Sequence, residues 1–158
     1  RRDVFDNPRY FREGGQAGFE TKRGCAHACI YCADPVAKGR TVRLRPPAVV
    51  ADELANLLRQ GIGHFHTCDA EFNQPEPHAR AVCEEVIRRK LRVNLSAVGV
   101  NPLTLSEELF TLMKRAGFIS LVISPDSASA AMLGNLRKGF TVEQVRNTAR
   151  WARESGAA

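Results

Sequence analysis

AGFETKRGCAHACIYC, residues 17–32, is the most informative stretch of this chain. Its first six residues are typical of a short β-strand. Three of the five cysteines follow within eight residues, as Cys25, Cys29 and Cys32. Because five cysteines cannot all pair internally, this crowding favours a metal site in a reducing compartment over a disulfide framework. A thiol-rich loop directly after a strand is therefore the feature around which we predict fold and function.

The composition is that of an ordinary globular protein. Of the 158 residues, 44% are hydrophobic and 25% are charged, which argues against general disorder. No apolar run approaches the roughly 18–20 residues that a membrane span needs, and no secretory signal follows Arg1. The net charge of +6 is spread along the chain, so nucleic acid is not the favoured partner. We expect a cytoplasmic protein that has no membrane segment.

Strands and helices are expected to alternate after an irregular lead-in at residues 1–16. The expected strands are 17–22, 64–68, 92–98 and 118–124. Helices are expected at 46–60, at 76–90, from a capping box between Thr104 and Glu107, at 127–136, and from a second capping box between Thr141 and Gln144 that closes around 153–156. This order predicts an α/β fold with a parallel sheet and right-handed crossovers.

The expected strands are polar on one face, although strands buried on both faces should be apolar throughout. The predicted polar side chains are Glu20, Lys22, His64, His66, Cys68, Asn94, Ser96, Ser120 and Ser124, and the opposite faces carry Phe19, Phe65, Val93, Leu95, Ile119, Leu121 and Ile123. This pattern predicts a barrel-like curl with helices outside and a polar, ligand-holding interior. The alternative is that short strands alternate by chance.

The spacing of the three cysteines suits two kinds of metal site. Three thiolates can hold an iron–sulfur cluster that leaves one iron open to a ligand. They can also bind zinc if a fourth ligand arrives from elsewhere, although the paired C-x-x-C segments usual for zinc are missing. The candidates for that fourth ligand are His27, His64, His66 and Cys68. Cys83 falls on the apolar stripe of its helix and is expected in the core.

The pattern C-x-x-x-C-x-aromatic-C, with Tyr31 as the aromatic residue, resembles the radical S-adenosylmethionine (radical SAM) superfamily. The segments ETKRGC (20–25), CADP (32–35) and KGR (38–40) are similar to its cobalamin-dependent branch. The resemblance covers residue 15 to the C-terminus. It implies that the three cysteines hold a 4Fe-4S cluster, that the open iron binds S-adenosylmethionine, and that Tyr31 packs against the cluster or the adenine. It also implies cobalamin as a further cofactor and an electron donor such as a flavodoxin or ferredoxin.

The same resemblance suggests residues that contact S-adenosylmethionine. Asp69, Ala70 and Glu71 stand where the family has a Gly-Gly-Glu-like turn that binds the amino group, but without its glycines, so backbone carbonyls or carboxylates would be the acceptors. Ser124 and Asp126 resemble the ribose-binding end of the fourth strand, and Arg137 lies in a segment that resembles one meeting the carboxylate. A solvated turn, helix capping and a basic surface are the alternatives for these three places.

The family barrel has six strand–helix units, and this chain has room for about four. We therefore expect residues 17–158 to be the N-terminal part of a partial (β/α) barrel, with later units and any cobalamin-binding domain absent. Such a fragment is expected to self-associate through its open sheet edge. The predicted function is the core of a radical SAM enzyme for methyl transfer or carbon-skeleton modification of a small molecule; no residue is predicted to handle the substrate radical. The alternatives are a cobalamin-independent RNA-modifying methyl- or methylthiotransferase and a zinc-stabilised α/β nucleic-acid-binding module.

Overall fold

The computed structural model describes residues 4–154, and its centre is a four-stranded parallel sheet. The strands are β1 (Ala17–Phe19), β4 (His64–Thr67), β5 (Asn94–Ala97) and β6 (Phe118–Leu121), in the order β1-β4-β5-β6. Each strand pairs with the next in parallel, which confirms the predicted α/β class. The sheet remains open between β1 and β6 in the described residues, so the barrel is not closed.

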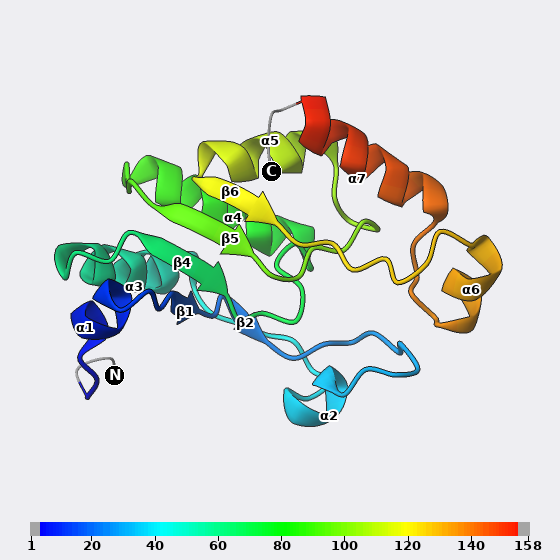
Figure 1. Ribbon diagram of the computed structural model, residues 1–158, viewed down its shortest axis with the longest axis horizontal. Helices are drawn as coiled ribbons and strands as arrows, with labels where there is room; N and C mark the ends of the chain where they lie inside the picture. The colour runs from blue at the N-terminus through cyan, green and yellow to red at the C-terminus, as the bar shows by residue number, and fades with distance from the viewer. Residues whose placement is uncertain (1–3, 155–158) are drawn as a thin grey trace.

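The long helices cover one face of the sheet, as Figure 1 shows. The long ones are α3 (Pro47–Arg59), α4 (Glu76–Arg88), α5 (Glu107–Arg115) and α7 (Val142–Glu154), and the short ones are α1 (Asn7–Arg12), α2 (Asp34–Ala37) and α6 (Ala130–Asn135). Of the short helices, α2 and α6 lie away from the sheet (Figure 1). A separate antiparallel pair, β2 (Lys22–Arg23) with β3 (Arg43–Leu44), leads into and out of the cysteine segment. The predicted first strand is therefore divided, because β1 ends at Phe19 and Lys22 already belongs to β2.

The core lies between the sheet and these helices. Phe65, Leu95 and Phe118 from the strands are buried there against the apolar stripes of the helices, such as Leu54 and Leu109. Burial of each such side chain stabilises the fold by roughly 1.5–3 kcal/mol. Cys83 is fully buried in the same cluster, as expected, and this burial raises the pKa of its thiol to about 12. Cys83 is thus a packing residue with an unreactive thiol.

Several predicted boundaries differ from the structure: the strand expected at 118–124 ends at Leu121, and the helix expected at 127–136 begins at Ala130. The lead-in and the helix expected from Thr104 also differ. The lead-in 1–16 is not wholly irregular, because the Asp6 side chain accepts a hydrogen bond from Arg9 N (3.0 Å) and caps α1. The helix expected from Thr104 instead begins after Ser106, whose Oγ accepts from Leu109 N (3.1 Å). The Thr104 hydroxyl is instead directed at Asn73, where it accepts from Asn73 Nδ2 (3.0 Å) and donates to Asn73 O (3.2 Å).

The second predicted capping box is confirmed at the start of α7. Gln144 N donates to Thr141 Oγ1 (3.2 Å), and Thr141 N donates to Gln144 Oε1 (2.8 Å). The helix is described to Glu154, and the rest of the closing segment expected at 153–156 lies outside the described residues. Reciprocal capping therefore sets where the last helix begins.

The face assigned to Ile119 is also wrong. The register between β5 and β6 moves from Leu95 opposite Phe118 to Ser96 opposite Ser120, so β6 has one extra residue at this point. Such a bulge turns the extra residue out of the alternation, and Ile119 is exposed. The sequence period alone could not show this, because a bulge is set by pairing with the neighbouring strand.

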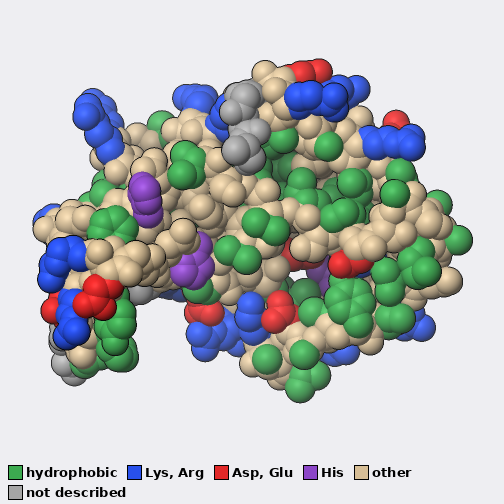
Figure 2. All heavy atoms as spheres, viewed as in Figure 1, with side chains coloured by type: hydrophobic (Ala, Val, Ile, Leu, Met, Phe, Trp, Pro, Cys, Tyr) green, Lys and Arg blue, Asp and Glu red, His purple; other side chains and the backbone are tan. Residues whose placement is uncertain are grey.

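The other face of the sheet is polar, as predicted. His66, Ser96 and Ser120 are aligned across β4, β5 and β6 and are partly buried, whereas His64 and Asn94 are exposed. In the view of Figure 2, Lys and Arg side chains are scattered around the rim of the molecule and do not form one basic patch. Among the helices of residues 4–154, none is both long and apolar enough to cross a membrane.

Candidate cofactor site at the cysteine loop

The cysteine loop begins directly after β2 and is anchored by the β2–β3 pair. Gly24 has a φ of 114°, and a Cβ at this position would collide with the carbonyl of Thr41. Glycine is therefore required for the close approach of the two segments. The amide of Cys25 then donates to Gly39 O (2.9 Å), which fixes the first thiol of the loop.

All three cysteines of the motif line one cavity of about 170 Å³. The cavity is also lined by His27, Tyr31, Asp34, Pro35, Ala70, Glu71, Val98, Gly99, Val100, Asn101, Ser124, Lys138 and Phe140. Within residues 4–154, no three His, Cys, Asp or Glu side chains converge closely enough for one metal ion. A cubane cluster needs no such convergence, because each cysteine binds a different iron. Three thiols at one cavity are thus a donor set that fits a 4Fe-4S cluster.

The environment of the thiols favours their neutral form until positive charge is supplied. Burial raises the pKa of both Cys25 and Cys29. Cys29 Sγ also lies 3.6 Å from the carbonyl oxygen of Arg137, to which a thiol can donate. Thiolates become favourable at such a place when they bind cationic iron centres, which compensate for the loss of water.

Glu71 is one of two carboxylates that line the cavity, the other being Asp34. Its Oε1 accepts from Asn101 Nδ2 (2.8 Å), and its Oε2 lies 2.8 Å from His27 Nε2, which also contacts the side chain of Gln74. The interaction with Glu71 is the largest cause that raises the pKa of His27. Asn101 thus holds Oε1 of the Glu71 carboxylate, whereas Oε2 lies within ion-pair distance of His27 and has no hydrogen-bond partner among the described residues.

Ala70 also lines the cavity, beside Gly99 at the end of β5. A Cβ on Gly99 would lie 2.5 Å from the carbonyl oxygen of Ala70. The absence of a side chain at Gly99 therefore lets the turn pack closely against the strand end, where Phe72 N donates to Gly99 O (2.8 Å).

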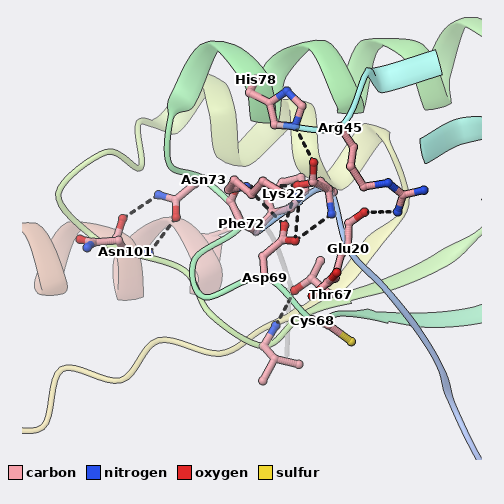
Figure 3. Close-up of polar contacts among 12 residues, drawn as sticks. Glu20, Lys22, Arg45, Thr67, Cys68, Asp69, Phe72, Asn73, His78 and Asn101 are labelled. Atoms are coloured by element: carbon pink, nitrogen blue, oxygen red, sulfur yellow. Dashed lines mark hydrogen bonds and ion pairs between the residues drawn. The ribbon is translucent and has the colours of Figure 1, made fainter. Parts of the chain in front are cut away.

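Asp69, the third predicted residue of this turn, points elsewhere. Its carboxylate is buried and accepts hydrogen bonds from the backbone and side chains of Thr21 and Lys22, as Figure 3 shows. It is not among the residues that line the cavity. Of the predicted Asp69, Ala70 and Glu71 set, the structure thus brings only the last two to the cysteines.

Tyr31, Lys138 and Asp126 form a second polar group, of which Tyr31 and Lys138 line the cavity. Tyr31 OH donates to Asp126 Oδ2 (2.6 Å), and Lys138 Nζ donates to Tyr31 OH (2.7 Å) and to the same carboxylate oxygen (2.5 Å). Hydrogen bonds from Lys138 and Tyr31 lower the pKa of Asp126. Burial lowers the pKa of Lys138, but its bonds to Asp126 and Tyr31 outweigh this and raise it overall. The group is therefore an ammonium–carboxylate pair bridged by a phenol.

Lys138, and not the predicted Arg137, presents the basic group to the cavity. Lys138 lines it, together with the predicted Ser124, while Arg137 is exposed. Arg137 has a left-handed φ of 56°, and Asp126 one of 63°, which is uncommon for residues other than glycine. The sequence did place both bases in the right segment, but only these backbone turns decide which one faces inward.

The candidates for a fourth zinc ligand are distributed unevenly. His27 lines the cavity but is engaged by Glu71. His64 is exposed and sets its ring edge-on to Phe11, with 6.0 Å between ring centroids. His66 and Cys68 lie on the polar face of the sheet and are not among the cavity residues.

Comparison with known proteins places this site in a family. The radical SAM superfamily model matches residues 19–158. A tryptophan 2-C-methyltransferase from Streptomyces laurentii is 36% identical over 135 residues, which are 81% of this chain and 22% of that protein. An anaerobic magnesium-protoporphyrin IX monomethyl ester cyclase from Rubrivivax gelatinosus is 30% identical over 136 residues, which are 85% of this chain and 24% of that protein.

The solved structures agree with the sequence relatives. The radical S-adenosylmethionine methyltransferase TsrM from Kitasatospora setae, solved with cobalamin and a 4Fe-4S cluster bound, matches with a TM-score of 0.88 and 32% identity. The match covers 94% of this chain and 31% of that one. The chain thus spans less than a third of these relatives. With the family model matching nearly the whole chain and its motif cysteines gathered at one cavity, this chain belongs to the radical SAM superfamily.

Proposed function

We propose that this chain is the cluster- and S-adenosylmethionine-binding core of a cobalamin-dependent methyltransferase that acts on a small molecule. The observation that carries the proposal is the cavity that brings three free thiols together with the carboxylates of Asp34 and Glu71 and the ammonium of Lys138. The relatives support the reaction type, since both the tryptophan 2-C-methyltransferase and TsrM are named as methyltransferases and the TsrM structure holds cobalamin.

The cysteines and the charged walls of the cavity have separate tasks in this proposal. Cys25, Cys29 and Cys32 would hold the cluster, which would supply an electron for cleavage of a C–S bond of S-adenosylmethionine. The methionine part of S-adenosylmethionine carries an ammonium and a carboxylate. Glu71 accepts hydrogen bonds from the ammonium, and Lys138 donates to the carboxylate.

The neighbouring residues complete the binding site. The carbonyl of Ala70 is a second acceptor for the ammonium, and Ser124 reaches the same cavity as a partner for the ribose. The Tyr31 ring forms part of the wall, and its hydroxyl orients Lys138. Asp126 binds Lys138 and Tyr31 and so acts on the ligand through them.

The partners of the proposed enzyme follow from its chemistry. A small-molecule substrate agrees with the names of the relatives, one of which refers to tryptophan and the other to a porphyrin ester. The cyclase relative makes carbon-skeleton ring formation the second candidate reaction. A low-potential electron donor such as a flavodoxin or ferredoxin, and a reducing compartment such as the cytoplasm, suit free thiols and a redox cluster.

Anaerobic reconstitution of the full-length protein tests the proposal. We expect roughly four irons and four sulfides per chain, as for one cubane cluster. Each of Cys25→Ala, Cys29→Ala and Cys32→Ala should lose the cluster, whereas the matched control Cys83→Ala should retain it. Transfer of a labelled methyl group from S-adenosylmethionine to reduced cobalamin tests the reaction type. One zinc per chain without sulfide would refute the proposed function.

A further inference from the structure

Two acidic residues in one turn, Asp69 and Glu71, point in opposite directions. Glu71 faces the cavity, whereas Asp69 reaches back to the connection between β1 and β2. Asp69 Oδ1 accepts from the amides of Thr21 (2.8 Å) and Lys22 (3.3 Å), and its Oδ2 accepts from Thr21 Oγ1 (2.6 Å). The turn is therefore attached to the strand that leads into the cysteine loop.

The ammonium of Lys22 strengthens this attachment by binding both ends of the turn. Its Nζ donates to Asp69 Oδ2 (3.3 Å) and to the carbonyl oxygen of Phe72 (2.7 Å), and it also lies 3.1 Å from Thr21 Oγ1 (Figure 3). Asp69 and Phe72 flank Ala70 and Glu71 in sequence. One buried side chain thus holds the two residues that border the ligand-facing pair.

The pair of Lys22 and Asp69 is more deeply buried than the other ion pairs between residues 4 and 154. The side chains of Lys22 and Asp69 are 3% and 0% exposed, and no other described pair has both partners below a tenth. Apolar residues of similar volume would often stabilise such a place as well as a buried ion pair does. They would not supply directed hydrogen bonds to both ends of a turn, and this points to a geometric role.

We propose that Lys22 and Asp69 are positioning residues that hold the Ala70–Glu71 turn against the cysteine loop and so set the affinity for S-adenosylmethionine. Lys22 precedes Cys25 by three residues, and Asp69 precedes Glu71 by two. A shift between these two segments changes the distance between cluster and carboxylate directly. The inference rests on the proposed function, because it takes Glu71 as a contact of the bound molecule.

The test compares four variants of the full-length protein. Lys22→Met and Asp69→Asn each remove one partner, and the double variant Lys22→Met/Asp69→Asn leaves no unpaired charge. Arg89→Met is the matched control, because Arg89 joins α3 to α4 through Asp52 and Glu85 and does not line the cavity. The measurements are iron content, equilibrium dialysis of S-adenosylmethionine, kcat and KM for methyl transfer to cobalamin, and amide hydrogen exchange of residues 70–73 in the cluster-free protein.

In the double variant we expect normal iron content but at least about tenfold weaker binding of S-adenosylmethionine, equal to the loss of one charged hydrogen bond. KM should rise with kcat nearly unchanged, and amides 70–73 should exchange faster, while Arg89→Met matches the wild type. If single variants fail to fold, the double variant decides. Wild-type affinity and exchange in the double variant would overturn the positioning role alone. Absence of the cluster from the wild type would instead overturn the proposed function and this inference with it.

Discussion

Two lysine–aspartate pairs flank the cysteine loop, and they differ in burial. The side chains of Lys22 and Asp69 are 3% and 0% exposed, whereas those of Lys138 and Asp126 are 9% and 37% exposed. Burial lowers the pKa of Lys22 despite its carboxylate partner, while the hydrogen bonds of Lys138 outweigh its burial and raise its pKa. The same two residue types thus build a pair closed to solvent and a pair open to it.

This difference in burial assigns different work to the two pairs. A pair without access to water cannot exchange its partners for a ligand, and its hydrogen bonds hold backbone segments together. A pair that borders a cavity can give up part of its bonding when a charged ligand enters. We infer that Lys22 and Asp69 set the shape of the site, whereas Lys138 binds the charged ligand that enters it.

The largest effect is expected on stability when the buried pair of Lys22 and Asp69 is broken. Lys22→Met leaves Asp69 buried without its cation and should lower the stability of this domain by about 3–5 kcal/mol. Lys138→Met should cost about 1 kcal/mol or less, because water reaches Asp126. Hydrogen exchange of peptides from β4 and α4 in the cluster-free full-length protein measures both. Equal losses in the two variants would show that burial does not distinguish the pairs.

An intermediate effect is expected on ligand binding at the open pair. Lys138→Met should weaken S-adenosylmethionine binding by roughly ten- to a hundredfold, which is the range for a hydrogen bond to a charged group. Arg137→Met is the matched control and should change the affinity little, because Arg137 is exposed outside the cavity. Equilibrium dialysis of the reconstituted protein measures the two constants. A greater loss in Arg137→Met would reverse the assignment made from the structure.

The smallest expected effect is a pH dependence of stability that arises from His78, which lies beside the buried pair. His78 Nε2 donates to Thr21 O (3.1 Å), so the neutral ring carries its proton there. Burial lowers the pKa of His78 in the folded protein. The unfolded chain therefore takes up a proton first as the pH falls below about 6.5.

Stability should accordingly be unaffected by this group above that pH and should decrease below it, until the folded-state pKa is passed. The slope for one proton is at most about 1.4 kcal/mol per pH unit. Urea unfolding from pH 7.5 to 5 should show a weaker dependence in His78→Gln than in the wild type. The exposed His64→Gln serves as control and should follow the wild type; a pH dependence unchanged by His78→Gln would contradict the assignment.

Much of the fold was predictable because its signals are local. Apolar residues at helical spacing indicated α3, α4 and α5, and the Thr141–Gln144 box indicated the start of α7. Errors arose where a distant contact overrode a local preference. Thr104 bonds to Asn73 instead of capping a helix, and pairing with β5 turns Ile119 outward.

The candidate site shows the same division. The cysteine spacing predicted the cluster ligands because the three cysteines lie within eight residues on one loop. The neighbouring polar residues were ambiguous, because Asp69 and Glu71, like Arg137 and Lys138, belong to the same short segment. The sequence placed Lys22 on the polar face of the first expected strand, but it did not show that Lys22 and Thr21 bind Asp69.

The sequence by itself determined that this protein alternates strands with helices and carries a three-cysteine cofactor loop, because periodicity and motif spacing are properties of neighbouring residues. Only the tertiary structure decided that Glu71 and Lys138, and not Asp69 and Arg137, line the cavity beside the cysteines. Lys22 donates a hydrogen bond to Asp69, which is 47 residues away in the sequence. Lys138 donates one to Tyr31, which is 107 residues away. The free energy of a charged side chain depends on its burial and partners, and both are settled only when distant segments pack together.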